Sequence, residues 1–236
     1  FAVIHKKGVS KELNLLGYSG VDYKNLKLIM VQSSPLILQY AVSITSWEFF
    51  YILIEHHGRE ALAISNAMRN LFGVIGTFPW AFASTTNTMV SNAIGQGRQD
   101  KVIFLINRIS ILSVSICAVI TLLLNFFPGT FLSIYGQDES FVEHAIPIIR
   151  VVSGAIMLMS IGAIWLNAVT GTGNTKVNLA IELIVIFFYS IYIYLVLSYW
   201  NLPIIYGWMS EWFYWTFTFT LSYLYIRSRK WEKKVV

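Results

Sequence analysis

The chain has 236 residues, of which 56% are hydrophobic and 12% are charged, and its formal net charge is +5. Soluble domains carry about 25% charged residues, so this composition excludes an ordinary soluble domain and indicates a membrane protein. The positive charge does not indicate a nucleic-acid partner, because the basic residues lie mainly at the ends of apolar stretches rather than in one patch.

Six apolar stretches are each long enough to cross about 30 Å of hydrocarbon as a helix. They cover residues 29–54, 61–94, 102–127, 145–170, 177–200 and 204–226. The sequence therefore predicts an all-α, polytopic membrane protein with a six-helix transmembrane lobe at 27–226. We expect 1–26 to be a cytoplasmic linker that follows a preceding helix, and 227–236 to be a basic cytoplasmic tail.

The basic residues are distributed unevenly between the two ends of the predicted helices. Those that flank the first, second, fourth and sixth stretches are Lys6, Lys7, Lys11, Lys24, Lys27, Arg98, Lys101, Lys176, Arg227, Arg229, Lys230, Lys233 and Lys234. The alternate loops contain only Arg59. By the positive-inside rule, this asymmetry predicts a multi-pass protein of the cell membrane with both termini of the chain in the cytoplasm.

The first two stretches are joined by a polar turn at 56–60, and each carries an ionisable residue at depth. Glu48 and Arg69 each lie about ten residues from the turn, which is roughly 15 Å along a helix. In an antiparallel hairpin they would face each other. Ionisable residues at such depth are costly and usually mark an ion or substrate pathway, so we expect Glu48 and Arg69 to couple in transport. The alternative is a structural ion pair that fixes the two helices.

Other polar side chains follow the same two helical faces. Thr45 and Tyr51 recur at helical spacing from Glu48, and Asn66 lies beside Arg69. We include all three in the candidate transport site. The alternative is that both faces are packing seams, in which polar residues bridge neighbouring helices.

The later stretches carry fewer candidates. Cys117 lies in the middle of the third stretch, which rules out an internal disulfide and favours a packing role. Arg150 lies in the fourth stretch. We expect it close to the outer third of the membrane and include it in the candidate site. Glu182 lies near the cytoplasmic start of the fifth stretch, where an interfacial carboxylate is the simpler interpretation.

The sixth stretch contains Trp208, Glu211, Trp212 and Trp215. These tryptophans predict an aromatic belt at the outer membrane interface. Glu211 would then face either a cavity or the lipid headgroups.

Two helix ends have similar sequences. The second stretch ends Asn-Ala-Ile-Gly-Gln-Gly at 92–97, and the fourth ends Asn-Ala-Val-Thr-Gly-Thr-Gly at 167–173. Neither follows a strand or fits a phosphate-binding loop, so we expect glycine stops at helix C-termini.

The runs at 81–97 and 167–177 resemble the ends of the second and fourth helices of the C-terminal lobe of multidrug and toxic compound extrusion (MATE) transporters. The resemblance extends over nearly the whole chain. It implies one lobe of a two-lobe transporter with six helices per lobe, whose partner is the N-terminal lobe of the same protein. It also implies secondary active antiport within membrane lipid, in which small cationic or amphipathic compounds are exported in exchange for Na+ or H+ and no cofactor is used.

The resemblance has two departures from the family pattern. Glu48 looks like an acid that some members carry in the first helix of this lobe. Many members also carry an acid where this chain has Ser43, and some carry one in the fourth helix, where this chain has none. Coupling would then depend on Glu48 or on the N-terminal lobe.

Three other interpretations remain open. A lipid-linked oligosaccharide flippase has a similar architecture, and Arg69 and Arg150 would suit its pyrophosphate group. An intramembrane enzyme is disfavoured, because the sequence shows no catalytic constellation and His56-His57 lacks the spacing of a metal site. A non-transport membrane scaffold would not be expected to carry polar faces on successive helices.

Overall fold

The computed structural model describes residues 22–135 and 139–233, and it is helical throughout these ranges without a strand. The long helices are α3 (Tyr23–Glu55), α4 (Arg59–Gly95), α5 (Val102–Phe126), α7 (Glu139–Gly171), α8 (Thr175–Ile193) and α10 (Ser210–Arg227). The short ones are η1 (Gln99–Lys101), α6 (Pro128–Leu132), η2 (Ser133–Tyr135), η3 (Tyr194–Tyr199), α9 (Ile204–Trp208) and η4 (Lys230–Lys233). The predicted all-α fold is confirmed.

The first described helix begins earlier than the sequence suggested. The side chain of Asp22 accepts hydrogen bonds from the backbone N–H groups of Lys24, at 3.0 Å, and Asn25, at 3.2 Å. Asp22 is therefore the N-cap of α3, because it satisfies amides that have no partner inside the helix. Residues 1–21 of the predicted linker lie outside the described residues.

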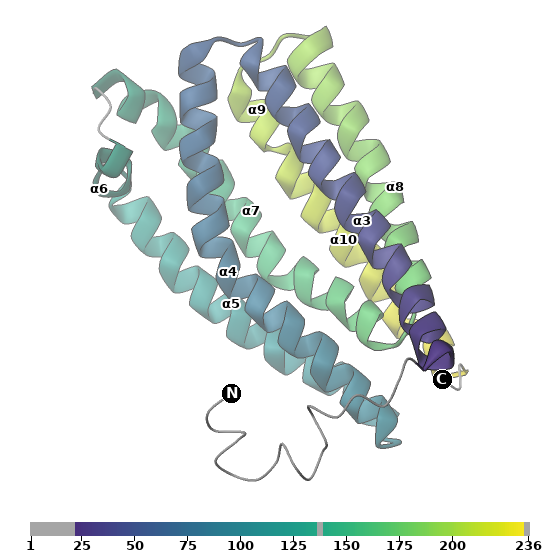
Figure 1. The fold of residues 1–236 in the computed structure, drawn as a ribbon. Helices are drawn as coiled ribbons and strands as arrows, with labels where there is room; N and C mark the ends of the chain where they lie inside the picture. The colour runs from purple at the N-terminus through teal and green to yellow at the C-terminus, as the bar shows by residue number, and fades with distance from the viewer. Residues whose placement is uncertain (1–21, 136–138, 234–236) are drawn as a thin grey trace.

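The helices form two groups that meet at α7 (Figure 1). In one group α3 and α10 pack against α8, and in the other α4 and α5 pack against each other and against α7. Helix α7 also packs against α10 and so connects the groups. Because α3 and α4 have different partners, they diverge from the turn that joins them instead of forming a closely paired hairpin.

Within the described residues, four helical segments are long and apolar enough to cross a membrane: Tyr23–Glu55, Gln99–Phe126, Glu139–Gly171 and Thr175–Tyr199. Helices α4 and α10 carry more polar residues, and several of these are buried within the lobe, such as Ser65, Thr86 and Thr218. The outward faces of α5 and α8 instead expose large apolar side chains, as expected where a helix contacts lipid.

Both predicted glycine stops are confirmed. Helix α4 ends at Gly95 and α7 ends at Gly171, and each is followed two residues later by a glycine in the left-handed region, Gly97 at φ 72° and Gly173 at φ 77°. After α4, the N–H group of Arg98 donates to a carbonyl group of the last helical turn at 2.8 Å. A residue with a Cβ atom would be strained at these two φ values.

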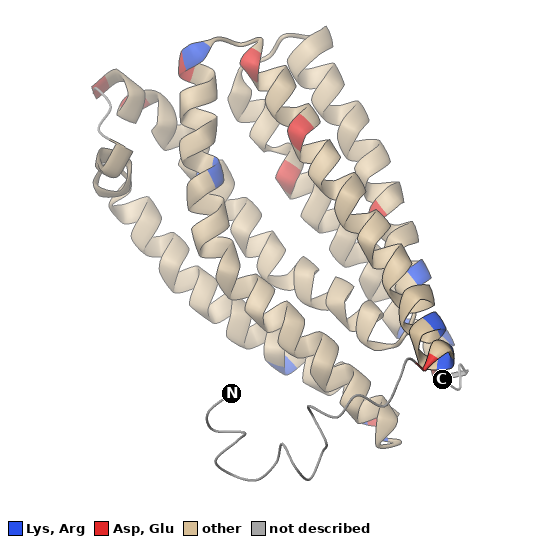
Figure 2. Ribbon diagram, viewed as in Figure 1, with Lys and Arg blue, Asp and Glu red and all other residues tan. Residues whose placement is uncertain are grey.

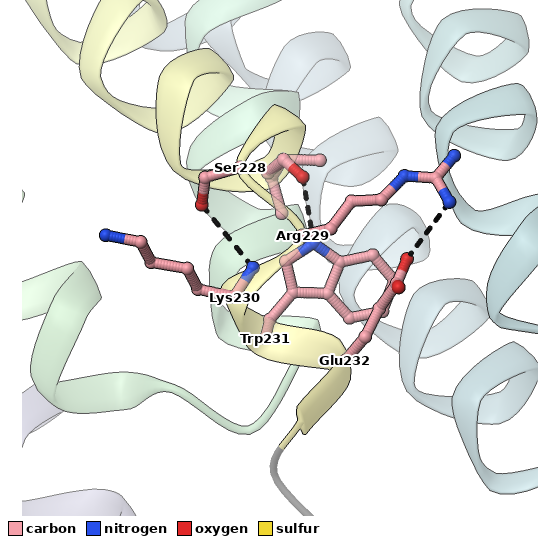
Figure 3. Close-up of polar contacts among 6 residues, drawn as sticks. Ser228, Arg229, Lys230, Trp231 and Glu232 are labelled. Atoms are coloured by element: carbon pink, nitrogen blue, oxygen red, sulfur yellow. Dashed lines mark hydrogen bonds and ion pairs between the residues drawn. The ribbon is translucent and has the colours of Figure 1, made fainter.

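The chain reverses direction after α10. Arg229 adopts a positive φ of 52°, and η4 then folds back so that the indole Nε1 of Trp231 donates to the carbonyl oxygen of Ile226 at 2.9 Å (Figure 3). Trp231 is buried, and Arg229 lies 3.7 Å from the carboxylate of Glu232. The described part of the predicted basic tail is thus folded against α10, and residues 234–236 lie outside the described residues.

Lys and Arg residues are concentrated at the end of the lobe where α3 begins and α10 ends (Figure 2). This is the distribution that the sequence predicted for the cytoplasmic end, and the assignment of that end to the cytoplasm stays a prediction.

Candidate functional site

Helices α3, α4, α7, α8 and α10 together line a cavity of about 830 Å³. Its charged lining residues are Glu48, Arg69, Glu182 and Glu211. Aromatic rings make up much of the remaining wall: Tyr40, Trp47, Phe72, Trp80, Tyr189, Tyr214 and Trp215. The volume is in the range of cavities that hold small organic ligands, and the wall combines apolar area with few polar groups, as such sites usually do.

Glu48 and Arg69 both line this cavity but form no ion pair within the described ranges. The alternative of a structural ion pair between them is therefore not observed in the described residues, and their coupling in transport stays a prediction. Arg69 instead lies over the ring of Tyr51, with 5.1 Å between the guanidinium carbon and the ring centroid. The hydroxyl group of Tyr51 donates to the carbonyl oxygen of Ser65 at 3.0 Å, so this buried tyrosine supports Arg69 from behind the cavity wall.

The other predicted site residues do not line the cavity. The hydroxyl group of Thr45 donates to the carbonyl oxygen of Ala41 at 2.8 Å, and its side chain lines a separate recess between α3 and α8. Asn66 and Arg150 are exposed on α4 and α7 and are not among the cavity residues. Thr45 precedes Glu48 by three residues and so points about 60° away from it around the helix.

Glu182 is buried rather than interfacial, which corrects the expectation from its position near the start of α8. Its exposed fraction is 1%, and it lies between α3 and α10. Its Oε1 atom accepts hydrogen bonds from the hydroxyl groups of Ser43 and Tyr214, each at 2.5 Å. Its Oε2 atom is buried without a hydrogen-bond partner in the described part of the chain. A carboxyl group in this state is costly unless something else binds it.

Glu182 is the last member of a row of polar contacts between α3 and α8, which we call the α3–α8 polar seam. The seam consists of three hydrogen-bonded pairs: Thr175 with Gln32, Asn178 with Gln39, and Glu182 with Ser43. The first pair includes Thr175, the first residue of α8, and the last pair lines the cavity. The signal in the sequence was the spacing of Thr175, Asn178 and Glu182 along one face of an otherwise apolar helix.

Glu211 also lines the cavity, with an exposed fraction of 3%, and the indole of Trp215 donates to its Oε2 atom at 3.2 Å. The predicted aromatic belt is wrong for Trp208 and Trp215, which are both buried. Trp212 is exposed as expected. The helix is interrupted at Met209, between α9 and α10, and α10 turns Glu211 and Trp215 toward the interior of the lobe.

The charges of the cavity favour positively charged ligands. Three carboxyl groups and one guanidinium group line it, and the electron-rich faces of aromatic rings also attract cations. The carboxyl groups are spread over α3, α8 and α10, and among the described residues no group of three or more His, Cys, Asp or Glu side chains could hold a metal ion. The arrangement therefore suits an organic cation or single small cations at separate carboxyl groups.

The chain is similar to a known protein family and to several solved structures. A family model described as MatE matches residues 35–200. A search of curated protein sequences found no significant match.

Solved transporter structures share the fold. A MOP superfamily transporter from Pyrococcus furiosus superposes with a TM-score of 0.71 at 16% identity, covering 85% of this chain and 44% of that one. The MATE transporter VcmN of Vibrio cholerae, in the bent form, gives a TM-score of 0.79 at 15% identity, covering 87% of this chain and 47% of that one. The chain therefore spans less than half the length of these structures, and at such identities the likeness shows the fold alone.

Proposed function

The chain belongs to the MatE family of membrane transporters, and we propose that it is the C-terminal half of a secondary active antiporter that exports cationic or amphipathic compounds in exchange for Na+ or H+. Members of this family are transporters rather than enzymes, and the apolar helices agree with a multi-pass membrane protein. Beyond membership of the family, we propose the direction of transport, the class of exported compounds and the use of a coupling ion.

The observation that carries the proposal is that carboxyl groups outnumber cationic groups in the cavity. Glu48, Glu182 and Glu211 outnumber Arg69, and the surrounding aromatic wall provides apolar contact area. An amphipathic cation needs both features, because its charge requires a counterion and its apolar part gains from leaving water. The cavity of about 830 Å³ is large enough to hold such a compound.

The same balance of charge argues against an oligosaccharide flippase. A pyrophosphate group requires several cations, yet Arg69 is the one Lys or Arg among the cavity residues of the described chain, and Arg150 lies elsewhere on α7. Pocket polarity bears on function in at least one solved relative, since the Pyrococcus furiosus transporter is described as having a binding pocket of reverse polarity that suggests a different function.

We further propose that an N-terminal lobe of the same protein completes the cavity. Glu48 and Arg69 are exposed in the chain alone, on the side where α3 and α4 diverge. A second lobe opposite this side would enclose the cavity, and the share of the solved structures that the chain covers, 44% to 47%, leaves room for one. The remaining apolar surface would contact membrane lipid, with the basic end of the lobe in the cytoplasm of a cell-membrane protein.

Transport by the complete protein in proteoliposomes tests the proposal. A lipophilic cation dye such as ethidium is loaded, and a gradient of H+ or Na+ is imposed in separate experiments. We expect one of the two gradients to drive accumulation of the dye against its own gradient. Transport that requires neither gradient, or a protein that moves a lipid-linked oligosaccharide but no cation, would contradict the proposal.

A further inference from the structure

We propose that Glu182 is the proton-coupling site of this lobe: it binds one proton when the cavity is empty and releases it when a cation enters. The proposal rests on the antiport function proposed above, and it assigns the coupling ion to α8 rather than to the more exposed Glu48.

The first argument is the pairing of oxygen atoms around Glu182. Two hydroxyl donors, from Ser43 and Tyr214, already bond its Oε1 atom. The Oε2 atom is left without a partner, and so is the Oδ1 atom of Asn178, one helical turn earlier on the same face of α8; both atoms are buried, with residue exposures of 1% and 2%. These two buried acceptors leave room for one proton.

A single proton supplies a donor at the Oε2 atom. Its binding forms an O–H bond on Oε2 and converts the carboxylate to the neutral acid, and the new hydroxyl is a donor for which Asn178 offers an acceptor on the same face. The proton comes from water and returns to water, so no oxidant or other reactant is needed. A hard metal cation takes about six oxygen ligands, whereas a proton needs only the free Oε2 atom found here.

Glu182 also has no fixed counterion among the described residues. Within the described residues no Lys, Arg or His forms an ion pair with Glu182. The titratable and charged groups that face the same cavity are Tyr40 and Glu48 of α3, Arg69 of α4, Tyr189 of α8, and Glu211 and Tyr214 of α10. Helix α7 adds none, since Ala163, Leu166 and Asn167 are its cavity residues. A buried carboxylate without a paired cation favours its neutral form until a cation replaces the proton.

The third argument is access from two directions. Glu182 lines the cavity, and it also ends the α3–α8 polar seam that starts at Thr175, the first residue of α8. A coupling proton has to reach its site from one side of the membrane and leave toward the other. The cavity provides a polar path to Glu182 from one side, and the α3–α8 polar seam provides polar groups on the other side, between helices that are otherwise apolar.

Counting protons during ligand binding tests the proposal. The complete transporter is titrated with tetraphenylphosphonium in two buffers of different ionisation enthalpy, and the difference in heat gives the number of protons released. We expect the wild type to release about one proton per bound cation at any pH at which the empty site holds its proton. The Glu182→Gln variant keeps the shape and both hydroxyl contacts, so it should bind the cation more weakly and release about one proton fewer.

The control is Glu48→Gln, which should weaken binding but still release the proton. If Glu182→Gln does not fold, Ser43→Ala and Tyr214→Phe each retain the carboxyl group with one donor removed, and proton release should occur at a different pH from that of the wild type. Unchanged release in Glu182→Gln, or an unchanged pH profile in both other variants, would overturn the proposal. A wild type that binds the cation without releasing protons would also overturn it, whereas a wild type that binds no cation would overturn the proposed function itself.

Discussion

The carboxyl group of Glu182 on α8 accepts a hydrogen bond of 2.5 Å from the hydroxyl group of Ser43 on α3. By the family resemblance, Ser43 stands at a position where many members carry an acid. In this chain, α8 places the buried carboxyl group of Glu182 next to Ser43. Ser43 therefore donates a hydrogen bond to a carboxyl group at this place, and the carboxyl group itself comes from α8.

Neutralising Glu48 should weaken cation binding. Glu48 lines the cavity and is exposed, so its attraction for a bound cation is partly screened by water. For Glu48→Gln we expect a loss of about five- to tenfold in affinity for tetraphenylphosphonium, equivalent to about 1 kcal/mol. The control is Glu55→Gln, at the end of the same helix and outside the cavity, and an equal loss in both variants would show that the effect is not local.

Removing the positive charge of Arg69 should have the opposite effect. Its guanidinium group shares the cavity with three carboxyl groups and repels an incoming cation. For Arg69→Gln we expect affinity for the same cation to rise about two- to fivefold, with no change for Arg150→Gln outside the cavity. If Arg69→Gln abolishes binding, Arg69 contacts the ligand directly, and the flippase interpretation gains support.

Gly171 should tolerate no side chain. A Cβ atom there would lie 2.8 Å from the backbone oxygen of Asn87 and 2.9 Å from the Cβ of Val90, so α4 and α7 would have to separate. We expect Gly171→Ala to lower the free energy of unfolding by about 1–3 kcal/mol, measured by denaturant unfolding in detergent. Gly95, the matching residue at the end of α4, has open space around it, so Gly95→Ala should change stability little. Equal stability of the two variants would contradict the close packing of α4 on α7.

Trp231 should stabilise the C-terminal end of the lobe. It is 3% exposed and its indole is hydrogen-bonded to the end of α10, so Trp231→Ala should cost about 3 kcal/mol of unfolding free energy. Trp200, which is 57% exposed, offers a control with the same chemical change. A neutral Trp231→Ala would mean that the chain after α10 adds nothing to the stability of the fold.

The fold class and the helix ends could be predicted from the sequence because they depend on local patterns. Apolar stretches of sufficient length predict helices that span a membrane, and the glycines after α4 and α7 predict the left-handed residues found at Gly97 and Gly173. Membership of the MatE family was also visible in these two helix ends.

The partners of the ionisable residues could not be predicted, because they depend on how helices pack. Counting from the turn gave Glu48 and Arg69 the same depth, but depth does not determine distance when two helices diverge. Glu182 was assigned to an interface because of its position near the end of a helix, yet the packing of α3 and α10 on α8 buries it. Glu211 was ambiguous for the same reason, since its sequence neighbourhood of tryptophans fits either a membrane interface or a protein interior.

The most direct test of the central claim, that the cavity of this lobe selects cations through its carboxyl groups, is a comparison of two ligands of nearly equal size and opposite charge. Equilibrium binding of tetraphenylphosphonium and tetraphenylborate is measured on the complete transporter and on the triple variant Glu48→Gln, Glu182→Gln, Glu211→Gln. We expect the wild type to prefer the cation and the triple variant to lose this preference. Equal binding of both ions by the wild type, or a preference for the anion, would contradict the claim.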